Sequence, residues 1–188
     1  PNREAPVPVA ENLRESMKRS SWIRKMFEEG DRMKSIHGED QVYDFSLGNP
    51  ILEPPPEVHE RIKELLRQPE PGMHRYMSNA GYLETRAKVA SQLRKETGLA
   101  FEADDVVMCV GAGGGLNVVM KSLLDPGDEV LVPTPYFVEY SAYAQNHGGL
   151  LKTVPTTEEF QPDLQAFAEA LNRRTKIVLI NTPNNPTG

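Results

Sequence analysis

Residues 176–188 read Lys-Ile-Val-Leu-Ile-Asn-Thr-Pro-Asn-Asn-Pro-Thr-Gly, and this stretch indicates how the chain folds. Its first part is apolar and β-branched, which predicts a buried strand over 176–181. The prolines and the final glycine predict a tight polar loop where that strand ends. In an open α/β sheet, ligands bind outside the carboxyl ends of the strands. A functional site is therefore expected in this loop and in the loops beside it.

The chain upstream of this stretch repeats a strand–loop–helix pattern. Short apolar runs alternate with segments of helical periodicity, which predicts βαβ units and a mainly parallel sheet with helices on both faces. The predicted fold class is therefore α/β. Strands are expected at 106–110, 129–132, 150–154 and 176–181, and helices at 116–124, 137–147 and 163–172.

The part of the chain before residue 100 is predicted to be mostly helical. Helical spacing of apolar residues predicts helices over 11–36, 56–67 and from Gly81 to about Thr97, and Ser20-Ser21 is compatible with a break in the first. The alternating run 42–47 predicts a short strand. Residues 1–10 hold three prolines and form either an extended arm or a disordered one.

Composition narrows the possible classes of protein. The 188 residues suffice for one good core, and a net charge of −6 argues against a general nucleic-acid binder. The single cysteine, Cys109, stands in an apolar run and is expected to be buried, which fits a reducing compartment. No apolar run approaches the about 18 residues of a membrane span, and residues 1–10 lack the layout of a signal peptide. A cytoplasmic location and no membrane partner are therefore expected.

The cluster Gly111-Ala-Gly-Gly-Gly115 lies between a predicted strand and a predicted helix. Glycines let the backbone approach an anion, and a helix N-terminus offers unpaired N–H groups, so a phosphate cradle is one interpretation. A tight turn that needs positive φ angles is the other. The dinucleotide fingerprint fails at Leu116, and no acidic residue follows near 130–132. A compact phosphate ester therefore fits better than a nucleotide.

Two neighbouring strand ends carry further candidates. The run 133–140 contains Tyr136, Phe137 and Tyr140, which either stack on a flat ring or serve as packing residues. In the loop after the last strand, Asn184 and Asn185 are either amide donors or turn formers. A phosphate cradle, an aromatic ring and an amide at one sheet edge together indicate a phosphorylated aromatic ligand.

At this point the sequence resembles a known family, the class I/II aminotransferases, which are fold-type I enzymes that use pyridoxal 5'-phosphate (PLP). The resemblance extends from about residue 20 to residue 188 and implies two parts: an N-terminal arm and small-domain segment at 1–50, and the first part of a large PLP-binding domain at 51–188. It rests on Leu47-Gly-Asn-Pro50, Tyr76-x-x-x-x-Gly81, the glycine cluster, Leu124-Asp-Pro-Gly-Asp-Glu129, Pro133-Thr-Pro-Tyr-Phe137 and Asn184-Asn-Pro-Thr-Gly188.

The resemblance also implies roles for individual residues. The backbone N–H groups of Ala112, Gly113 and Gly114 would hold the PLP phosphate. Phe137 would stack on the pyridine ring, and Asn185 would bond its phenolic oxygen; both would also border the substrate. In a homodimer with shared active sites, the side chain of Tyr76 would reach the partner subunit's cofactor phosphate. Gly48 would approach the substrate carboxylate with its backbone. No metal site is predicted.

The activity implied by the resemblance is the transfer of an amino group between an L-amino acid and a 2-oxo acid. In the family, the Schiff-base lysine, the aspartate beside the ring nitrogen and the carboxylate-binding arginine follow the Asn-Pro-Thr-Gly loop, so these 188 residues alone are expected to be inactive. Three alternatives stay open. These are a β-elimination lyase or synthase on the same scaffold, a non-catalytic sensing or dimerisation module, and a Rossmann-type nucleotide binder.

Overall fold

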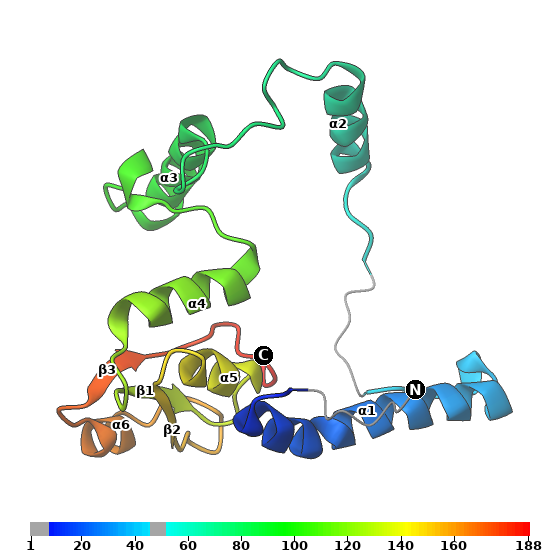
Figure 1. Ribbon diagram of the computed structural model, residues 1–188, viewed down its shortest axis with the longest axis vertical. Coiled ribbons are helices and arrows are strands. Elements are labelled where there is room, and N and C mark those ends of the chain that lie inside the picture. The colour runs from blue at the N-terminus through cyan, green and yellow to red at the C-terminus, as the bar shows by residue number, and fades with distance from the viewer. Residues whose placement is uncertain (1–7, 46–51) are drawn as a thin grey trace. The chain divides into compact units, whose positions relative to one another are not determined.

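The computed structural model describes residues 8–45 and 52–188, with only the backbone described at 12, 16 and 18–24 (Figure 1). The predicted substrate residue Gly48 lies outside the described residues. Contacts between Cα atoms divide the chain into two compact units, Pro1–Met73 and His74–Gly188. Each unit is described separately below.

The first unit is helical, as predicted. It contains α1 (Glu11–His37), the 3-10 turn η1 (Glu39–Gln41) and α2 (Pro56–Arg67). Helix α1 runs past Ser20-Ser21 without a break, and α2 begins at Pro56 because a first-turn proline lacks only an N–H that a helix leaves unpaired. The strand predicted over 42–47 is wrong for residues 42–45, which belong to no strand, and 46–47 lie outside the described residues. An extended segment becomes a strand only when a neighbour supplies a hydrogen-bond ladder.

The second unit begins with α3 (Leu83–Thr97), which ends where Gly98 adopts φ +73°, a left-handed conformation that glycine tolerates. The turn η2 (Ala103–Asp105) follows, and then α4 (Gly111–Leu123). The strand predicted over 106–110 is wrong: its one backbone bond to another segment of the described chain is Met108 N–H to Ala80 O, at 2.9 Å. The glycine cluster is also not a loop but the first turn of α4.

The sheet in this unit is parallel, as predicted. Its strands are β1 (Glu129–Pro133), β2 (Leu150–Val154) and β3 (Thr175–Val178), in the order β2-β1-β3. Val130 lies opposite Leu151 on one side and Ile177 on the other. Their carboxyl ends therefore share one edge of the sheet, which is called the carboxyl rim below. Residue 179 continues the pairing with one bond, Leu179 N–H to Leu131 O, although β3 itself ends at Val178.

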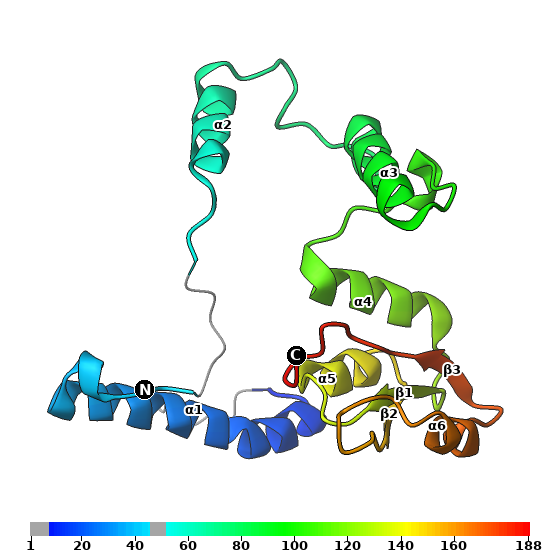
Figure 2. The ribbon, with the colours of Figure 1, turned by 180° about the vertical axis from the view of Figure 1, so that it is seen from behind.

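Helices cover both faces of the sheet, which confirms the α/β prediction (Figures 1 and 2). Val130 and Val132 pack on one face with Met120 of α4 and Ala144 of α5 (Glu139–Gln145). Successive side chains of a strand point to opposite faces. Leu131 therefore packs on the other face, with Val154 and with Phe167 of α6 (Leu164–Ala170).

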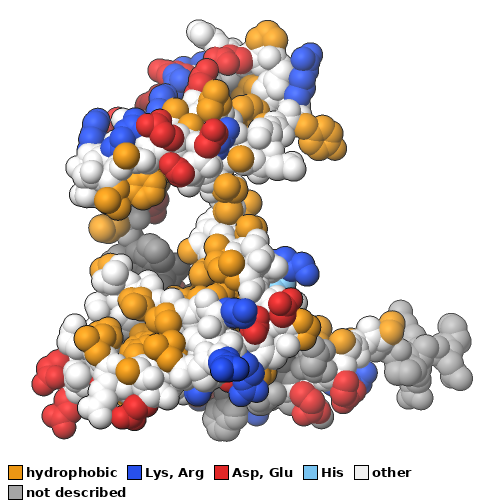
Figure 3. All heavy atoms as spheres, turned by 90° about the vertical axis from the view of Figure 1, so that its left-hand side faces the viewer, with side chains coloured by type: hydrophobic (Ala, Val, Ile, Leu, Met, Phe, Trp, Pro, Cys, Tyr) orange, Lys and Arg blue, Asp and Glu red, His pale blue; other side chains and the backbone are white. Residues whose placement is uncertain are grey.

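The surface of the molecule corrects one expectation, the burial of Cys109. The Cys109 thiol is exposed rather than buried, because the segment 106–110 that carries it has no neighbouring strand. Figure 3 shows hydrophobic side chains at the surface, and Val110 is 95% exposed. Among the described residues, no helix combines the length and the apolar character that crossing a bilayer requires.

Candidate functional site

The first turn of α4 presents two free backbone N–H groups. The Gly111 N–H bonds to Cys109 O, at 3.2 Å, and the Gly114 N–H bonds to Val110 O, at 3.3 Å. Between them, the N–H groups of Ala112 and Gly113 have no partner among the described residues. The first N–H groups of a helix point along its axis toward solvent and carry its partial positive charge. The two free donors can therefore bind an anion, whereas the Gly114 donor is already used within the helix.

Helix α5 packs against this turn through Tyr143. A Cβ placed on Gly113 would lie 2.9 Å from Tyr143 Oη, so no side chain fits at 113 without displacing the tyrosine. Asn117 donates from Nδ2 to Gly113 O, at 2.8 Å, and its Oδ1 lies 3.2 Å from His147 Nε2. Since the amide nitrogen of Asn117 is the donor to Gly113, its oxygen must accept, and His147 Nε2 carries the proton. These contacts fix α5 against the glycine turn.

Phe137 lies in the loop between β1 and α5 and is 36% exposed. Its ring meets that of Tyr140 edge to face, with centroids 5.5 Å apart and planes at 80°. Tyr140 is buried in the core and lies 6.5 Å from Tyr143, measured between ring centroids. Burial, and then the neighbouring Tyr143, raise the pKa of the Tyr140 phenol, so it stays protonated. Of these three rings, Phe137 is the most accessible to a flat ligand, and Tyr140 is a packing residue.

The loop after β3 is held to the loop after β1 by Asn184. Its Nδ2 donates to Pro135 O, at 3.1 Å, and to Thr187 Oγ1, at 2.8 Å. Asn185 is exposed. Asn184 therefore holds the turn, whereas Asn185 is accessible to a ligand.

A chain of contacts connects the first turn of α4 with the loops that follow β1 and β3. Gly113 contacts Tyr143, which leads through Tyr140 to Phe137, and Asn184 bonds the same loop at Pro135. Figures 1 and 2 both show the C-terminal loop returning beside α5. Gly113 and Phe137 are therefore linked through two tyrosine rings, and Asn185 is adjacent to Asn184, which is bonded to the loop that carries Phe137. Tyr76 belongs to the same unit but is fully exposed in the segment before α3, and no contact within the described chain joins it to the rim.

A hollow of about 320 Å³ adjoins the rim. It is bordered by Thr134 after β1, by Asn184, and by the turn 156–162, where Phe160 adopts φ +59°. Ala112, Gly113, Phe137 and Asn185 do not line it. The hollow therefore lies next to the candidate site and is not identical with it.

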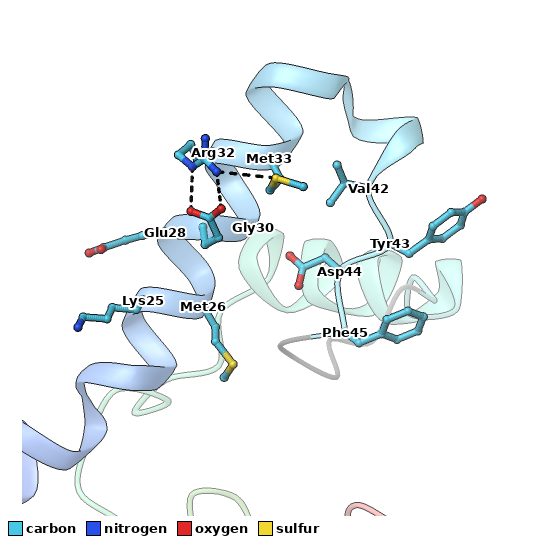
Figure 4. Close-up of a pocket in the computed structure, with 11 residues that line it drawn as sticks. Lys25, Met26, Glu28, Gly30, Arg32, Met33, Val42, Tyr43, Asp44 and Phe45 are labelled. Carbon is cyan, nitrogen blue, oxygen red and sulfur yellow. Dashed lines mark hydrogen bonds and ion pairs between the residues drawn. The ribbon is translucent and has the colours of Figure 1, made fainter.

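A larger hollow of about 890 Å³ lies in the first unit, between α1 and residues 42–45 (Figure 4). In Figure 4, Asp44 turns toward α1, while Tyr43 and Phe45 point away from it. Lys34 Nζ bonds to Asp44 Oδ2 at 2.7 Å and holds the segment to the helix. None of the site residues predicted from the sequence lines this hollow.

Three contributors to the site were missed by the sequence analysis: Tyr143, Asn117 and His147. Tyr143 follows Tyr140 at i+3 within the predicted helix 137–147, which was a usable signal that both rings share one helix face. Asn117 and His147 are thirty positions apart, and only the packing of α4 on α5 joins them. No metal-binding group of three or more His, Cys, Asp or Glu side chains occurs in the described part of the chain.

Comparison with known proteins shows the family to which the chain belongs. The family model "Aminotransferase class I and II" matches residues 40–188. Aspartate aminotransferase of Pyrococcus horikoshii is 34% identical over 170 residues, which is 89% of this chain and 41% of that protein. A probable aspartate/prephenate aminotransferase of Thermus aquaticus is 38% identical over 145 residues, or 76% of this chain and 37% of the relative. The chain thus spans about two-fifths of the length of these relatives.

Solved structures give the same result. An aminotransferase from Eubacterium rectale matches with a TM-score of 0.89 and 39% identity, covering 96% of this chain and 46% of that one. A Thermus thermophilus aspartate aminotransferase mutant matches with a TM-score of 0.70 and 36% identity, over 76% of this chain and 39% of that one.

Proposed function

Because the chain belongs to the class I and II aminotransferase family, we propose that it is the cofactor-holding front part of a PLP-dependent aminotransferase. The whole protein would transfer an amino group between an L-amino acid and a 2-oxo acid. One observation supports the proposal: contacts of Tyr143, Tyr140 and Asn184 link a helix turn that has two free N–H groups, an accessible aromatic ring and a loop with an exposed asparagine. Members of the family are PLP-dependent enzymes, and PLP has an anionic tail, a flat ring and a phenolic oxygen.

We assign each of these candidate residues to one part of PLP. Ala112 and Gly113 donate backbone N–H groups to the phosphate, where the partial positive charge of α4 favours an anion. Phe137 covers one face of the ring and excludes water from it. Asn185 donates its amide to the phenolic oxygen. When bound, PLP supplies an electron sink for the substrate Cα.

Two further residues are part of the proposal. We propose that Gly48 approaches the substrate carboxylate and that Tyr76 reaches the cofactor phosphate of a partner subunit in a homodimer. Full exposure of Tyr76 is compatible with a contact to a second chain. Gly114 was predicted as a third backbone donor, and the bond from its N–H to Val110 O leaves Ala112 and Gly113 as the stronger candidates.

The cofactor-linked lysine is proposed to lie outside these 188 residues. Lys152, the lysine of β2, forms an ion pair with Glu129 at 3.7 Å and donates a hydrogen bond to Ala170 O at 3.2 Å, away from the rim. Lys121 lies in the last turn of α4, at the opposite end from the free N–H groups. Neither side chain is therefore placed to bond a cofactor held at the first turn of that helix.

The experiment compares the whole protein with the 188-residue chain, each mixed with PLP and treated with borohydride. The whole protein is expected to show visible absorbance and to retain one reduced adduct on a lysine. The 188-residue chain is expected to retain none, and an adduct at a single lysine within it would contradict the proposed location. Keto-acid product from the whole protein supports transamination, whereas ammonia release identifies a lyase on the same scaffold.

A further inference from the structure

The Tyr143 hydroxyl occupies the space of the side chain that Gly113 lacks. A Cβ on Gly113 would lie 2.9 Å from Tyr143 Oη and 3.5 Å from its Cζ. The first distance is shorter than real Cβ contacts, and the second is ordinary van der Waals contact. The hydroxyl, rather than the ring, is therefore what fills this space.

The Tyr143 hydroxyl lies beside the N-terminal turn of α4. Cα–Cβ bonds of an α-helix tilt toward its N-terminus, and Tyr143 Oη lies 2.9 Å from the Cβ position of Gly113, a residue in the first turn of α4. The free N–H groups of Ala112 and Gly113 emerge at that same end. The hydrogen bonds that α5 makes with the described residues leave Tyr143 Oη without a partner. A phenol donor thus stands beside two backbone donors.

On the premise of the function proposed above, we propose that Tyr143 Oη is a third donor to the cofactor phosphate, supplied by α5 in place of a side chain on α4. Hydrogen bonds to a phosphate oxygen are stronger than those between neutral groups. The hydrogen bond between Asn117 of α4 and His147, which lies two residues after the end of α5, holds the two helices together before any ligand arrives. Because the donor is held in place beforehand, little ordering cost opposes its contribution.

The test removes the hydroxyl and keeps the ring. In the whole protein, Y143F is compared with wild type for binding of PLP and of pyridoxal, which has no phosphate. We expect the Kd for PLP to rise about tenfold, as for loss of one hydrogen bond to a charged group, and the Kd for pyridoxal to stay unchanged. Y136F is the matched control: it removes a hydroxyl from a ring packed on the same core and should leave both constants unchanged.

A double variant sharpens the result. Once Y143F has removed the hydroxyl, the nearest ring atom would lie 3.5 Å from a Cβ at position 113, so a serine side chain fits there. G113S/Y143F is expected to recover most of the affinity for PLP, since it returns a hydroxyl to the same space. An equal loss for PLP and pyridoxal in Y143F, or a double variant as weak as Y143F, assigns the effect to packing and overturns the inference.

The outcomes separate this inference from the proposed function. If wild type fails to bind PLP, the proposed function fails. If wild type prefers PLP to pyridoxal and Y143F keeps the same preference, the proposed function stands and only the role of Tyr143 is wrong.

Discussion

Glu129, at the amino end of β1, stabilises the sheet, whereas the loop after the carboxyl end of β1 carries candidate site residues. Glu129 is only 4% exposed, and its carboxylate accepts from Arg174 Nη2 at 2.8 Å and from Asn172 Nδ2 at 2.8 Å. The hydrogen bond from Asn172, and then the charges of Lys152 and Arg174, hold the pKa of the Glu129 carboxyl below its ordinary value. Away from the rim, a charged group of β1 thus contacts β2 and the segment just before β3 and stabilises the sheet.

The lowered pKa of Glu129 makes the free energy of unfolding depend on pH. A lowered carboxyl pKa stabilises the fold above the unfolded-state pKa, and the stabilisation is lost as pH falls through the folded-state value. Urea denaturation is expected to show E129Q less stable than wild type at pH 7, with the difference shrinking below about pH 4. E158Q, at an exposed turn position, should track wild type throughout. A constant gap between E129Q and wild type across this range would contradict the linkage.

At the scale of elements, caps and neighbours decide which predicted segments form. Helix α6 is only seven residues long, and its start is set by Asp163, whose Oδ1 accepts from the N–H groups of Gln165 and Ala166, both at 3.0 Å. Segment 106–110 has the apolar sequence of a strand but no paired neighbour. Local sequence is therefore enough to start a capped helix, whereas a strand also needs a partner.

The cap of α6 can be tested by a matched pair of variants. D163A is expected to destabilise the protein by about 0.5–2 kcal/mol, because two backbone donors lose their acceptor. D163N should cost much less, since an asparagine oxygen caps a helix as well as an aspartate does. Both values come from chemical denaturation, and equal losses for the two variants would show that the cap does not stabilise α6.

At the scale of the whole molecule, the two units differ in how much they bury. The buried apolar side chains described here, from Ala90 to Leu179, all belong to the unit His74–Gly188. In Pro1–Met73, the described side chains are exposed or half-buried, and large ones such as Tyr43 and Phe45 are 84% and 93% exposed. Local stability follows buried contacts, so the first unit is expected to open more readily.

Limited proteolysis of the 188-residue chain tests this difference. The first cuts are expected in residues 38–45 and 52–55, between the helices of the first unit, where exposed backbone is accessible to a protease. The segments of β1 and β2 should persist longest, because β1 is buried in the core and β2 is paired with it. Mass spectrometry of the early fragments identifies the cut sites. Early cleavage within 129–154 would contradict the expected order.

The sequence by itself determined that helices flank a parallel sheet and that loops with candidate site residues follow β1 and β3. Periodicity, caps and turn residues are local signals, and for that reason α2 and β2 lie where predicted. Only the tertiary structure decided that 106–110 stays unpaired, that Asn184 is used to hold a loop, and that Tyr143 fills the space beside Gly113. Those outcomes depend on which distant segments come together, and one chain's periodicity carries no information about such pairs.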